Sequence, residues 1–176
     1  MSGELVFVTH STSTDNEAGI ASGHRDVGLS ELGRAQAAEL GQRYRAAFYD
    51  VYCSDLRRAV ETAEIAFGTA FQVDARLREQ DFGERTGAPS RDIEVERLAT
   101  VGTPFPGGEG LRDCAERVQS FLGDVRGERV LLIGHRGIKV VLDHLLGGMT
   151  LDDAVRAPYV WQPGWTYELG ARALPL

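Results

Sequence analysis

The sequence has few cysteines and no long apolar stretch, and these two absences exclude several classes of protein. Only two of the 176 residues are cysteines, Cys53 and Cys114, and their spacing matches neither a metal site nor a disulfide scaffold. Cys53 ends an apolar run, so we expect it to be a buried and unreactive thiol. No apolar stretch approaches the roughly 18 residues that a transmembrane helix needs, so we expect no membrane partner.

Basic residues are also in the minority. The chain has 19 lysines and arginines against 26 aspartates and glutamates, and its formal net charge is -7. A protein that binds nucleic acid needs a basic face, so this balance predicts no nucleic-acid partner. A local basic pocket in an acidic protein would instead attract small anions. Residues 1–4 lack the positive start of a signal peptide, so we expect a cytoplasmic enzyme or binding protein.

The composition is typical of a globular protein, and we expect a single domain over residues 1–176. Hydrophobic residues make up 43% of the chain and charged residues 26%, which is enough to bury one core. Short apolar runs predict buried strands at residues 5–8, 51–53, 71–73 and 129–133, with a final strand pair within 159–169. Helical spacing of apolar residues predicts helices at 30–47, with Ser30 as the N-cap, and at 56–67, 111–125 and 138–146.

This alternation of strands and helices predicts an α/β fold, a three-layer α/β/α sandwich with a mostly parallel sheet. Sheets of this kind bind ligands at the carboxyl ends of their strands. His10, Ser54 and His135 each directly follow a predicted strand, so we expect their side chains to converge on one crevice. Residues 84–110 contain three prolines and several glycines, a pattern that predicts a lid insertion or a mobile segment.

Four motifs occur in order along the chain. The first comprises Thr9-His10-Ser11, Asn16, Gly23, Asp26 and Leu29-Ser30-Glu31-Leu32-Gly33. The second is Ser54-Asp55-Leu56-Arg57-Arg58-Ala59-Val60-Glu61-Thr62-Ala63, and the third is Leu77-Arg78-Glu79-Gln80-Asp81-Phe82-Gly83. The fourth is the apolar strand at 130–133 with Gly134 and then His135-Arg136. Together the motifs resemble those of the histidine phosphatase superfamily, also called phosphoglycerate mutase-like.

The resemblance implies a role for each matching residue. His10 would attack phosphorus in line and become a phosphohistidine, which divides one displacement into two easier ones. Arg58 and His135 would bind the phosphoryl oxygens and stabilise charge in the transition state. Glu79 would protonate the leaving oxygen and then activate water. The positions that contact phosphate in the family are matched by Asn16, Ser22 and the Gly23 backbone. The resemblance implies no metal and no other cofactor.

Three residues depart from the family pattern. Thr9 stands where the family has the arginine of Arg-His-Gly, which makes a charge-assisted fork to the phosphate. Losing such a contact would typically slow the reaction on the order of a hundredfold. Ser11 replaces the glycine of that motif, and Arg136 replaces the glycine after the second histidine.

Two interpretations follow from these departures. In the first, Arg136 supplies the charge that Thr9 lacks, and the chain is a metal-independent phosphatase that hydrolyses a small phosphomonoester. In the second, the site is catalytically impaired and binds a phosphorylated ligand or a protein partner without turnover. The retention of five family residues together favours the enzyme: His10, Asn16, Arg58, Glu79 and His135. A mutase is disfavoured because that branch carries a longer lid than residues 84–110 provide. A homodimer is compatible with the fold.

Several residues have a second interpretation. Arg57 is a better candidate than Arg58 for pairing with surface carboxylates, and Asp81 lies two positions from Glu79. Two arginines of the predicted lid, Arg91 and Arg97, are explained equally by contact with a second anionic group and by a solvated helix. Arg112 is a third candidate for such a contact. Trp161 and Trp165 are expected to pack the final strand pair, with stacking on a ligand as the less favoured alternative.

Overall fold

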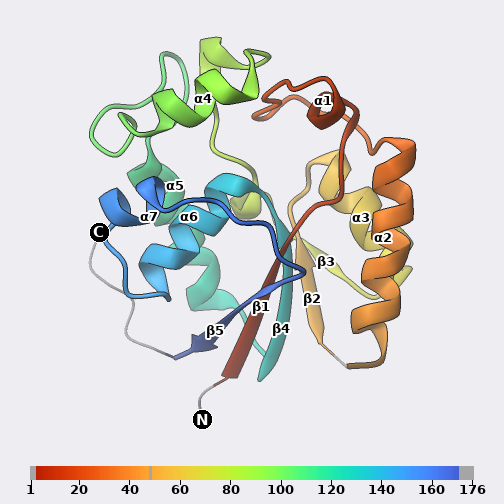
Figure 1. The fold of residues 1–176 in the computed structure, drawn as a ribbon. Coiled ribbons are helices and arrows are strands. Elements are labelled where there is room, and N and C mark those ends of the chain that lie inside the picture. The colour runs from red at the N-terminus through yellow and green to blue at the C-terminus, as the bar shows by residue number, and fades with distance from the viewer. Residues whose placement is uncertain (1–2, 48, 171–176) are drawn as a thin grey trace.

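A five-stranded sheet forms the middle layer of the protein (Figure 1). The structure is a computed structural model that describes residues 3–47 and 49–170. The strands are arranged in the order β3-β2-β4-β1-β5. β1, β2, β3 and β4 run parallel to one another, and the edge strand β5 pairs with β1 in the antiparallel direction. The bounds are Gly3–Thr9 for β1, Asp50–Cys53 for β2, Gln72–Val73 for β3, Arg129–Gly134 for β4 and Trp165–Leu169 for β5.

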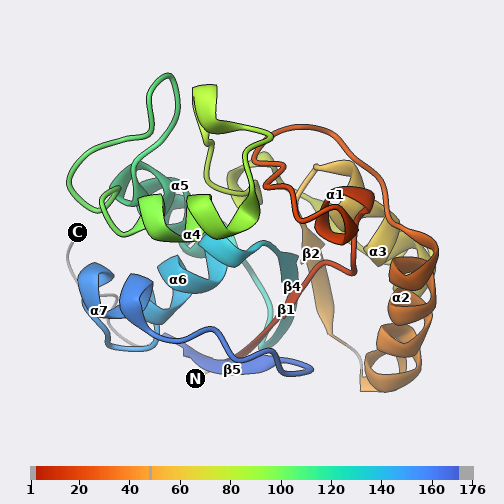
Figure 2. The same ribbon diagram turned by 45° about the horizontal axis from the view of Figure 1, so that its top comes forward.

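Helices cover both faces of this sheet, which confirms the predicted three-layer α/β/α sandwich (Figures 1 and 2). One face carries α2 (Glu31–Tyr44) and α3 (Arg57–Phe67), which pack against each other. The other face carries α5 (Leu111–Asp124) and α6 (Arg136–Leu145). The sequence did not predict α7 (Leu151–Arg156), which packs against α6.

The central strand β1 shows why the sequence produces this architecture. Leu5 and Phe7 point into the core formed with α5 and α6, whereas Val6 and Val8 point into the core on the α3 side. Because both faces of the strand are buried, its sequence is continuously apolar rather than alternating. The N-cap of α2 is Ser30, as predicted, and its side chain accepts a hydrogen bond from the Gly33 backbone.

Short elements gather at the end of the sheet where β1 ends (Figure 1). They include α1 (Thr14–Glu17), α4 (Ser90–Arg97) and the 3-10 helix Gly83–Arg85. Two further 3-10 helices span Arg45–Ala47 and Ala75–Leu77. Within residues 84–110, α4 is anchored by its buried Ile93, which packs with Phe82 and Phe105 in a small separate core. The predicted lid therefore contains an ordered helix.

The prediction of a final strand pair within 159–169 was wrong. Only β5 forms, and it adds to the sheet edge at β1, while residues 158–164 form neither helix nor strand. Pro163 in that segment has no backbone N–H to donate to a strand pair. Trp165 packs against Phe7 with ring centroids 5.8 Å apart, but Trp161 is 65% exposed instead of packing the sheet.

Both cysteines are buried and unpaired within the described residues. Burial raises the pKa of the Cys53 thiol to about 12, which agrees with the predicted unreactive thiol. In the described part of the chain, no helix is long and apolar enough to cross a membrane.

Candidate active site

The two histidines that follow β1 and β4 meet at one end of the sheet. The His10 backbone N–H donates to the Gly134 carbonyl at 2.9 Å, and this bond extends the β1–β4 pairing. The imidazole rings of His10 and His135 have centroids 4.9 Å apart. Ser54, the third residue expected at this crevice, is instead buried in the turn before α3, where its hydroxyl accepts from the Leu56 N–H.

The His10 ring has a defined tautomer. Its Nδ1 lies 2.8 Å from the Ser11 carbonyl oxygen, and its Nε2 lies 3.3 Å from Arg58 Nε. A carbonyl only accepts and a guanidinium only donates, so Nδ1 carries the proton and Nε2 carries the free lone pair. Burial and the Arg58 charge lower the pKa of His10 to about 3, although its bond to Ser11 acts in the opposite direction. The imidazole is therefore neutral near neutral pH, with its nucleophilic nitrogen toward Arg58.

Backbone carbonyls hold the Arg58 guanidinium beside His10. Arg58 is buried, and its Nη2 donates to the Gly23 carbonyl at 2.8 Å while its Nη1 donates to the Arg25 carbonyl at 3.0 Å. Gly23 has a φ of 50°, and a Cβ there would lie 3.0 Å from the Phe82 ring. This position therefore requires glycine in order to present its carbonyl to the arginine.

The neighbouring Arg57 points away from the crevice. Its Nε contacts Glu61 Oε1 at 2.7 Å, and its side chain is largely exposed. The structure thus distinguishes the two adjacent arginines in the predicted way, with Arg57 paired on the surface and Arg58 beside His10.

Asn16 and Ser22 lie on the loop after β1. Asn16 Oδ1 accepts from the Ser13 backbone N–H at 3.0 Å and from the Ser13 hydroxyl at 2.9 Å. These bonds orient the Asn16 side chain by its oxygen and leave its amide N–H groups available. Ser22 is buried and donates its hydroxyl hydrogen to Asp15 Oδ2 at 2.9 Å.

Glu79 is held against the first turn of α6. Its Oε1 accepts from the Gly137 backbone N–H at 2.9 Å and from the Gln80 backbone N–H at 2.7 Å. A Cβ on residue 137 would lie 2.3 Å from this oxygen, so a larger residue there would displace the Glu79 carboxyl group. Asp81 is engaged elsewhere, because its Oδ1 accepts from the Gly83 N–H at 2.9 Å. Of the two acidic residues, Glu79 is the one that lines a cavity with His10.

His135 is fully buried, and neither ring nitrogen has a hydrogen-bond partner within the described residues. Burial and the nearby charge of Arg58 lower the pKa of His135 well below its ordinary value. Buried polar atoms normally have partners, so the two ring nitrogens are unusual, and His135 lies behind His10 without lining either cavity that His10 lines.

A cavity of about 170 Å³ lies between His10 and α4. It brings together most of the predicted site residues with residues of the segment that was predicted to be a lid. The predicted residues that line it are His10, Asn16, Ser22, Gly23, Arg58, Glu79 and Arg136. Thr9 does not line this cavity, and the lid contributes Ser90, Ile93, Glu94 and Arg97.

The structure overturns one of the two interpretations of Arg97. Its side chain is 2% exposed, so its interpretation as part of a solvated helix was wrong. Arg97 Nη2 lies 3.6 Å from Glu79 Oε1, and its guanidinium lies over the Phe82 ring at 5.4 Å. Ile93 is four positions earlier in α4 and is also buried, so their shared helical face was the available signal.

Arg136 lies near Thr9 through one intervening aromatic residue. The Arg136 guanidinium stacks over the Tyr159 ring at 4.7 Å. Burial raises the pKa of the Tyr159 hydroxyl, whereas its hydrogen bond with Thr9 and the charge of Arg136 act in the opposite direction. Arg136 thus stacks on a tyrosine close to Thr9, but it lines the smaller cavity, which Thr9 does not.

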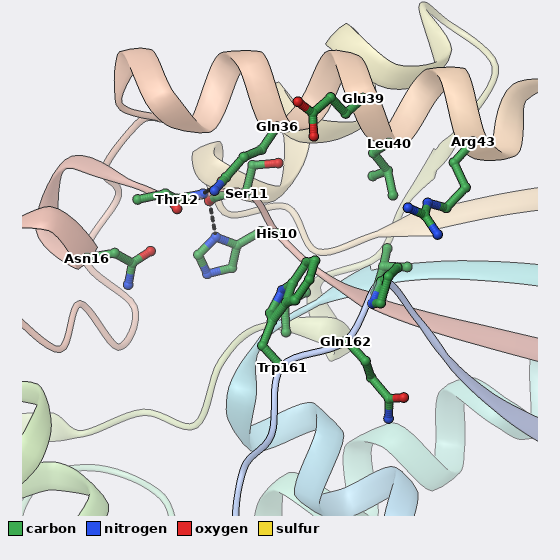
Figure 3. A pocket seen from close by; sticks show the side chains of 13 residues that line it. His10, Ser11, Thr12, Asn16, Gln36, Glu39, Leu40, Arg43, Trp161 and Gln162 are labelled. Atoms are coloured by element: carbon green, nitrogen blue, oxygen red, sulfur yellow. Dashed lines mark hydrogen bonds between the residues drawn. The ribbon is translucent and has the colours of Figure 1, made fainter.

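A second cavity, of about 430 Å³, opens on the other side of His10 (Figure 3). One wall is the face of α2 that carries Gln36, Glu39, Leu40 and Arg43. The opposite wall is the segment before β5, with Trp161 directed into the cavity alongside the histidine (Figure 3). Thr9 lines this larger cavity rather than the smaller one. His10 and Asn16 line both cavities.

Within the described ranges, no group of three or more histidine, cysteine, aspartate or glutamate residues is arranged to hold a metal ion. The side chains that line the small cavity include imidazole, guanidinium and carboxyl groups.

Known proteins resemble this chain in sequence and in fold. Residues 5–161 match the profile of the histidine phosphatase superfamily (branch 1). The chain is 34% identical over 164 residues to a protein of Hydrogenobacter thermophilus named "Putative phosphoserine phosphatase 2", covering 85% of this chain and 81% of that one. It is 33% identical over 188 residues to a 2,3-bisphosphoglycerate-dependent phosphoglycerate mutase of Parvibaculum lavamentivorans, covering 90% and 89%. The solved structure of a mycobacterial glucosyl-3-phosphoglycerate phosphatase with VO3 superposes with a TM-score of 0.74 at 28% identity, covering 87% of this chain and 86% of that chain.

Proposed function

Because the chain belongs to the histidine phosphatase superfamily, we propose that it hydrolyses a small phosphomonoester through a phosphohistidine on His10. The observation that carries this proposal is the ring of His10. Its nucleophilic Nε2 is unprotonated and lies in a cavity with the guanidiniums of Arg58 and Arg136 and the carboxyl group of Glu79. Relatives that are named as phosphatases or mutases act on small phosphorylated molecules, which supports the same substrate class here.

The first step forms a bond between His10 Nε2 and phosphorus. Arg58 Nε donates to His10 Nε2 in the free protein and turns to a phosphoryl oxygen when the substrate binds. His135 and Arg58 then donate to the phosphoryl oxygens, which carry the developing negative charge, and this lowers the barrier most where water is excluded. The ester P–O bond breaks as the N–P bond forms, and Glu79 gives its proton to the leaving oxygen.

The second step returns the enzyme to its starting state. Glu79, now a carboxylate, takes a proton from a water molecule whose oxygen attacks phosphorus. The N–P bond breaks and inorganic phosphate leaves. Glu79 Oε1 is already bound by two backbone N–H groups, so Oε2 is the oxygen that exchanges the proton. The Asn16 amide, the Gly23 N–H and the Ser22 hydroxyl, once it turns from Asp15, complete the contacts to the phosphoryl group.

We further propose that Arg136 compensates for Thr9. Threonine at position 9 offers one hydroxyl and no charge, and that hydroxyl interacts with Tyr159. Arg136 is stacked on the same tyrosine and lines the cavity that contains His10 and Glu79. If Arg136 has this role, Arg136→Ala will lower phosphate affinity more than Arg43→Ala, which removes an arginine from the larger cavity.

Acid-quench mixing with a chromogenic aryl phosphate tests the proposed reaction. The native chain is expected to release phosphate and to form an acid-labile phosphoprotein, and both signals should disappear in His10→Ala. Absence of both signals from a folded native chain would overturn the proposal.

The alternative is a protein that binds a phosphorylated ligand or a protein partner without turnover. Thr9 favours it, because that position lacks the charge expected of a catalytic site. It predicts tight phosphate binding with no hydrolysis and with His10 dispensable for binding. Activity in the cytoplasm, pairing as a homodimer and the role of residues 84–110 as a lid stay predictions.

A further inference from the structure

The lid helix α4 places one carboxylate between two arginines of the small cavity. Glu94 Oε1 lies 3.3 Å from Arg97 Nη1, and Glu94 Oε2 lies 3.7 Å from Arg136 Nε. Each oxygen therefore faces a different guanidinium. Neither contact has the geometry of a hydrogen bond, because Arg97 Nε, Arg97 Nη1 and Arg136 Nε have no such partner within the described residues.

These unmet donors set the two arginines apart from the third arginine of the cavity. Arg58 already donates to two carbonyls and to His10. Arg97 is 2% exposed, and burying a guanidinium whose donors are unmet is unfavourable. An anion with several oxygens would satisfy such donors with short, charge-assisted hydrogen bonds.

Glu94 is free to leave this position. Its side chain is 47% exposed, so it can turn toward water without losing buried contacts. Its two oxygens reach one arginine each, which is the arrangement that two oxygens of a bound phosphoryl group would adopt.

We propose that Arg97 and Arg136 form a two-arginine site for the phosphoryl oxygens of the substrate, and that Glu94 occupies this site until phosphate displaces it. This inference rests on the proposed function, because it assumes that phosphate binds beside His10. It assigns to Arg97, a residue of the lid, part of the positive charge that Thr9 does not supply. Because Glu94 belongs to α4, its side chain then couples phosphate binding to the packing of α4 over the site.

Titration calorimetry of the full-length chain with inorganic phosphate tests this proposal, at a pH where phosphate is a dianion. Arg97→Gln is expected to raise the Kd for phosphate about tenfold or more, the effect of losing a charged hydrogen bond. Glu94→Gln is expected to lower the Kd several-fold, because it removes the competing negative charge. In the double variant that combines Glu94→Gln with Arg97→Gln, the Kd for phosphate should be no lower than in Arg97→Gln alone.

Two matched controls lie on the same helix. Arg91 is 87% exposed at its side chain and contacts only Asp92, at 3.4 Å, among the ion pairs of the described residues. Arg91→Gln and Asp92→Asn therefore repeat the two charge changes outside the cavity, and both should leave the Kd unchanged. If Arg91→Gln weakens binding as much as Arg97→Gln, or if Glu94→Gln fails to tighten it, the proposal is wrong. Glu94→Gln is decisive even if Arg97→Gln unfolds, because a gain in affinity does not arise from misfolding.

The outcomes separate this inference from the proposed function. Phosphate affinities that follow the expected pattern in a chain that hydrolyses no phosphomonoester would support the two-arginine site and overturn the phosphatase. If the chain hydrolyses a phosphomonoester but the Kd for phosphate is unchanged in Glu94→Gln and Arg97→Gln, the two-arginine site alone is overturned. If the substitutions change the Kd only for esters that carry a second anionic group, and not for inorganic phosphate, the arginines bind the second group and the proposal is contradicted.

Discussion

The glycine at position 137 provides a direct test of the role proposed for Glu79. In Gly137→Ala, the new Cβ would lie 2.3 Å from Glu79 Oε1, so the carboxylate must move by about 1 Å to reach ordinary contact. The backbone itself tolerates alanine, because residue 137 lies in the first turn of α6 and has no positive φ. The substitution therefore displaces the carboxylate without removing any catalytic group.

The size of the effect follows from this displacement. A misplacement of about 1 Å in a reacting group typically costs on the order of a hundredfold in rate. General acid catalysis by itself contributes about a hundredfold to ten-thousandfold, so the loss should depend on how much the leaving oxygen needs a proton. We expect kcat/KM for an alkyl phosphate to fall about a hundredfold and that for p-nitrophenyl phosphate to fall less than about tenfold.

The assay compares the two substrates for the native chain, Gly137→Ala and Gly123→Ala. The quantity kcat/KM reports the steps up to release of the first alcohol, which include proton donation by Glu79. Gly123 is a helical glycine with nothing near its added Cβ, so Gly123→Ala should be neutral. An equal loss on both substrates, or no loss, would show that Glu79 does not protonate the leaving group.

Three further predictions concern stability and the larger cavity. The folded-state pKa of His10, about 3, is below its ordinary 6.5, so protonation favours unfolding and the free energy of unfolding should fall as pH drops from about 6.5 toward 3. Urea denaturation at several pH values should show a flatter dependence in His10→Gln, and an unchanged dependence would contradict the pKa shift. In Gly33→Ala the added Cβ would lie 1.9 Å from the Thr12 carbonyl oxygen, so the variant should lose about 1–3 kcal/mol or more, measured by denaturation. A neutral result there would mean that the loop after β1 moves freely. Trp161 is 65% exposed and lines the larger cavity, so Trp161→Ala should leave Tm nearly unchanged but raise KM for bulky aryl phosphates more than for small alkyl phosphates. Equal KM values in the variant and the native chain would exclude contact between Trp161 and the leaving group.

Most of the sheet was predictable because its strands are apolar on both faces. The runs at 5–8 and 130–133 leave no alternative that buries them in an ordinary α/β protein, and both form central strands. Strand β5 was less clear, because its Thr166 and Glu168 are exposed while Tyr167 is buried. Helix α7 has only six residues, too few for a periodic pattern to be read.

Most of the candidate site was predictable for a different reason. Residues that directly follow parallel strands end at one edge of the sheet, so His10 and His135 were expected to meet. Ser54 also follows a strand, but its hydroxyl bonds to a local backbone N–H, as serines in turns commonly do. The sequence alone offers no means to weigh that local bond against a contact across the site.

The sequence by itself determined the order of strands and helices, the histidine at the end of β1, and the motif residues that the loops bring beside it. Only the tertiary structure decided which arginines line the small cavity beside His10 and which carboxyl groups lie next to them. Arg97 is 87 positions from His10 in the sequence, and its burial depends on how α4 docks through Ile93 onto Phe82. Helical periodicity indicates which residues share a face of α4. The position of that face depends on contacts between segments that are distant in sequence, and these contacts place Glu94 between Arg97 and Arg136.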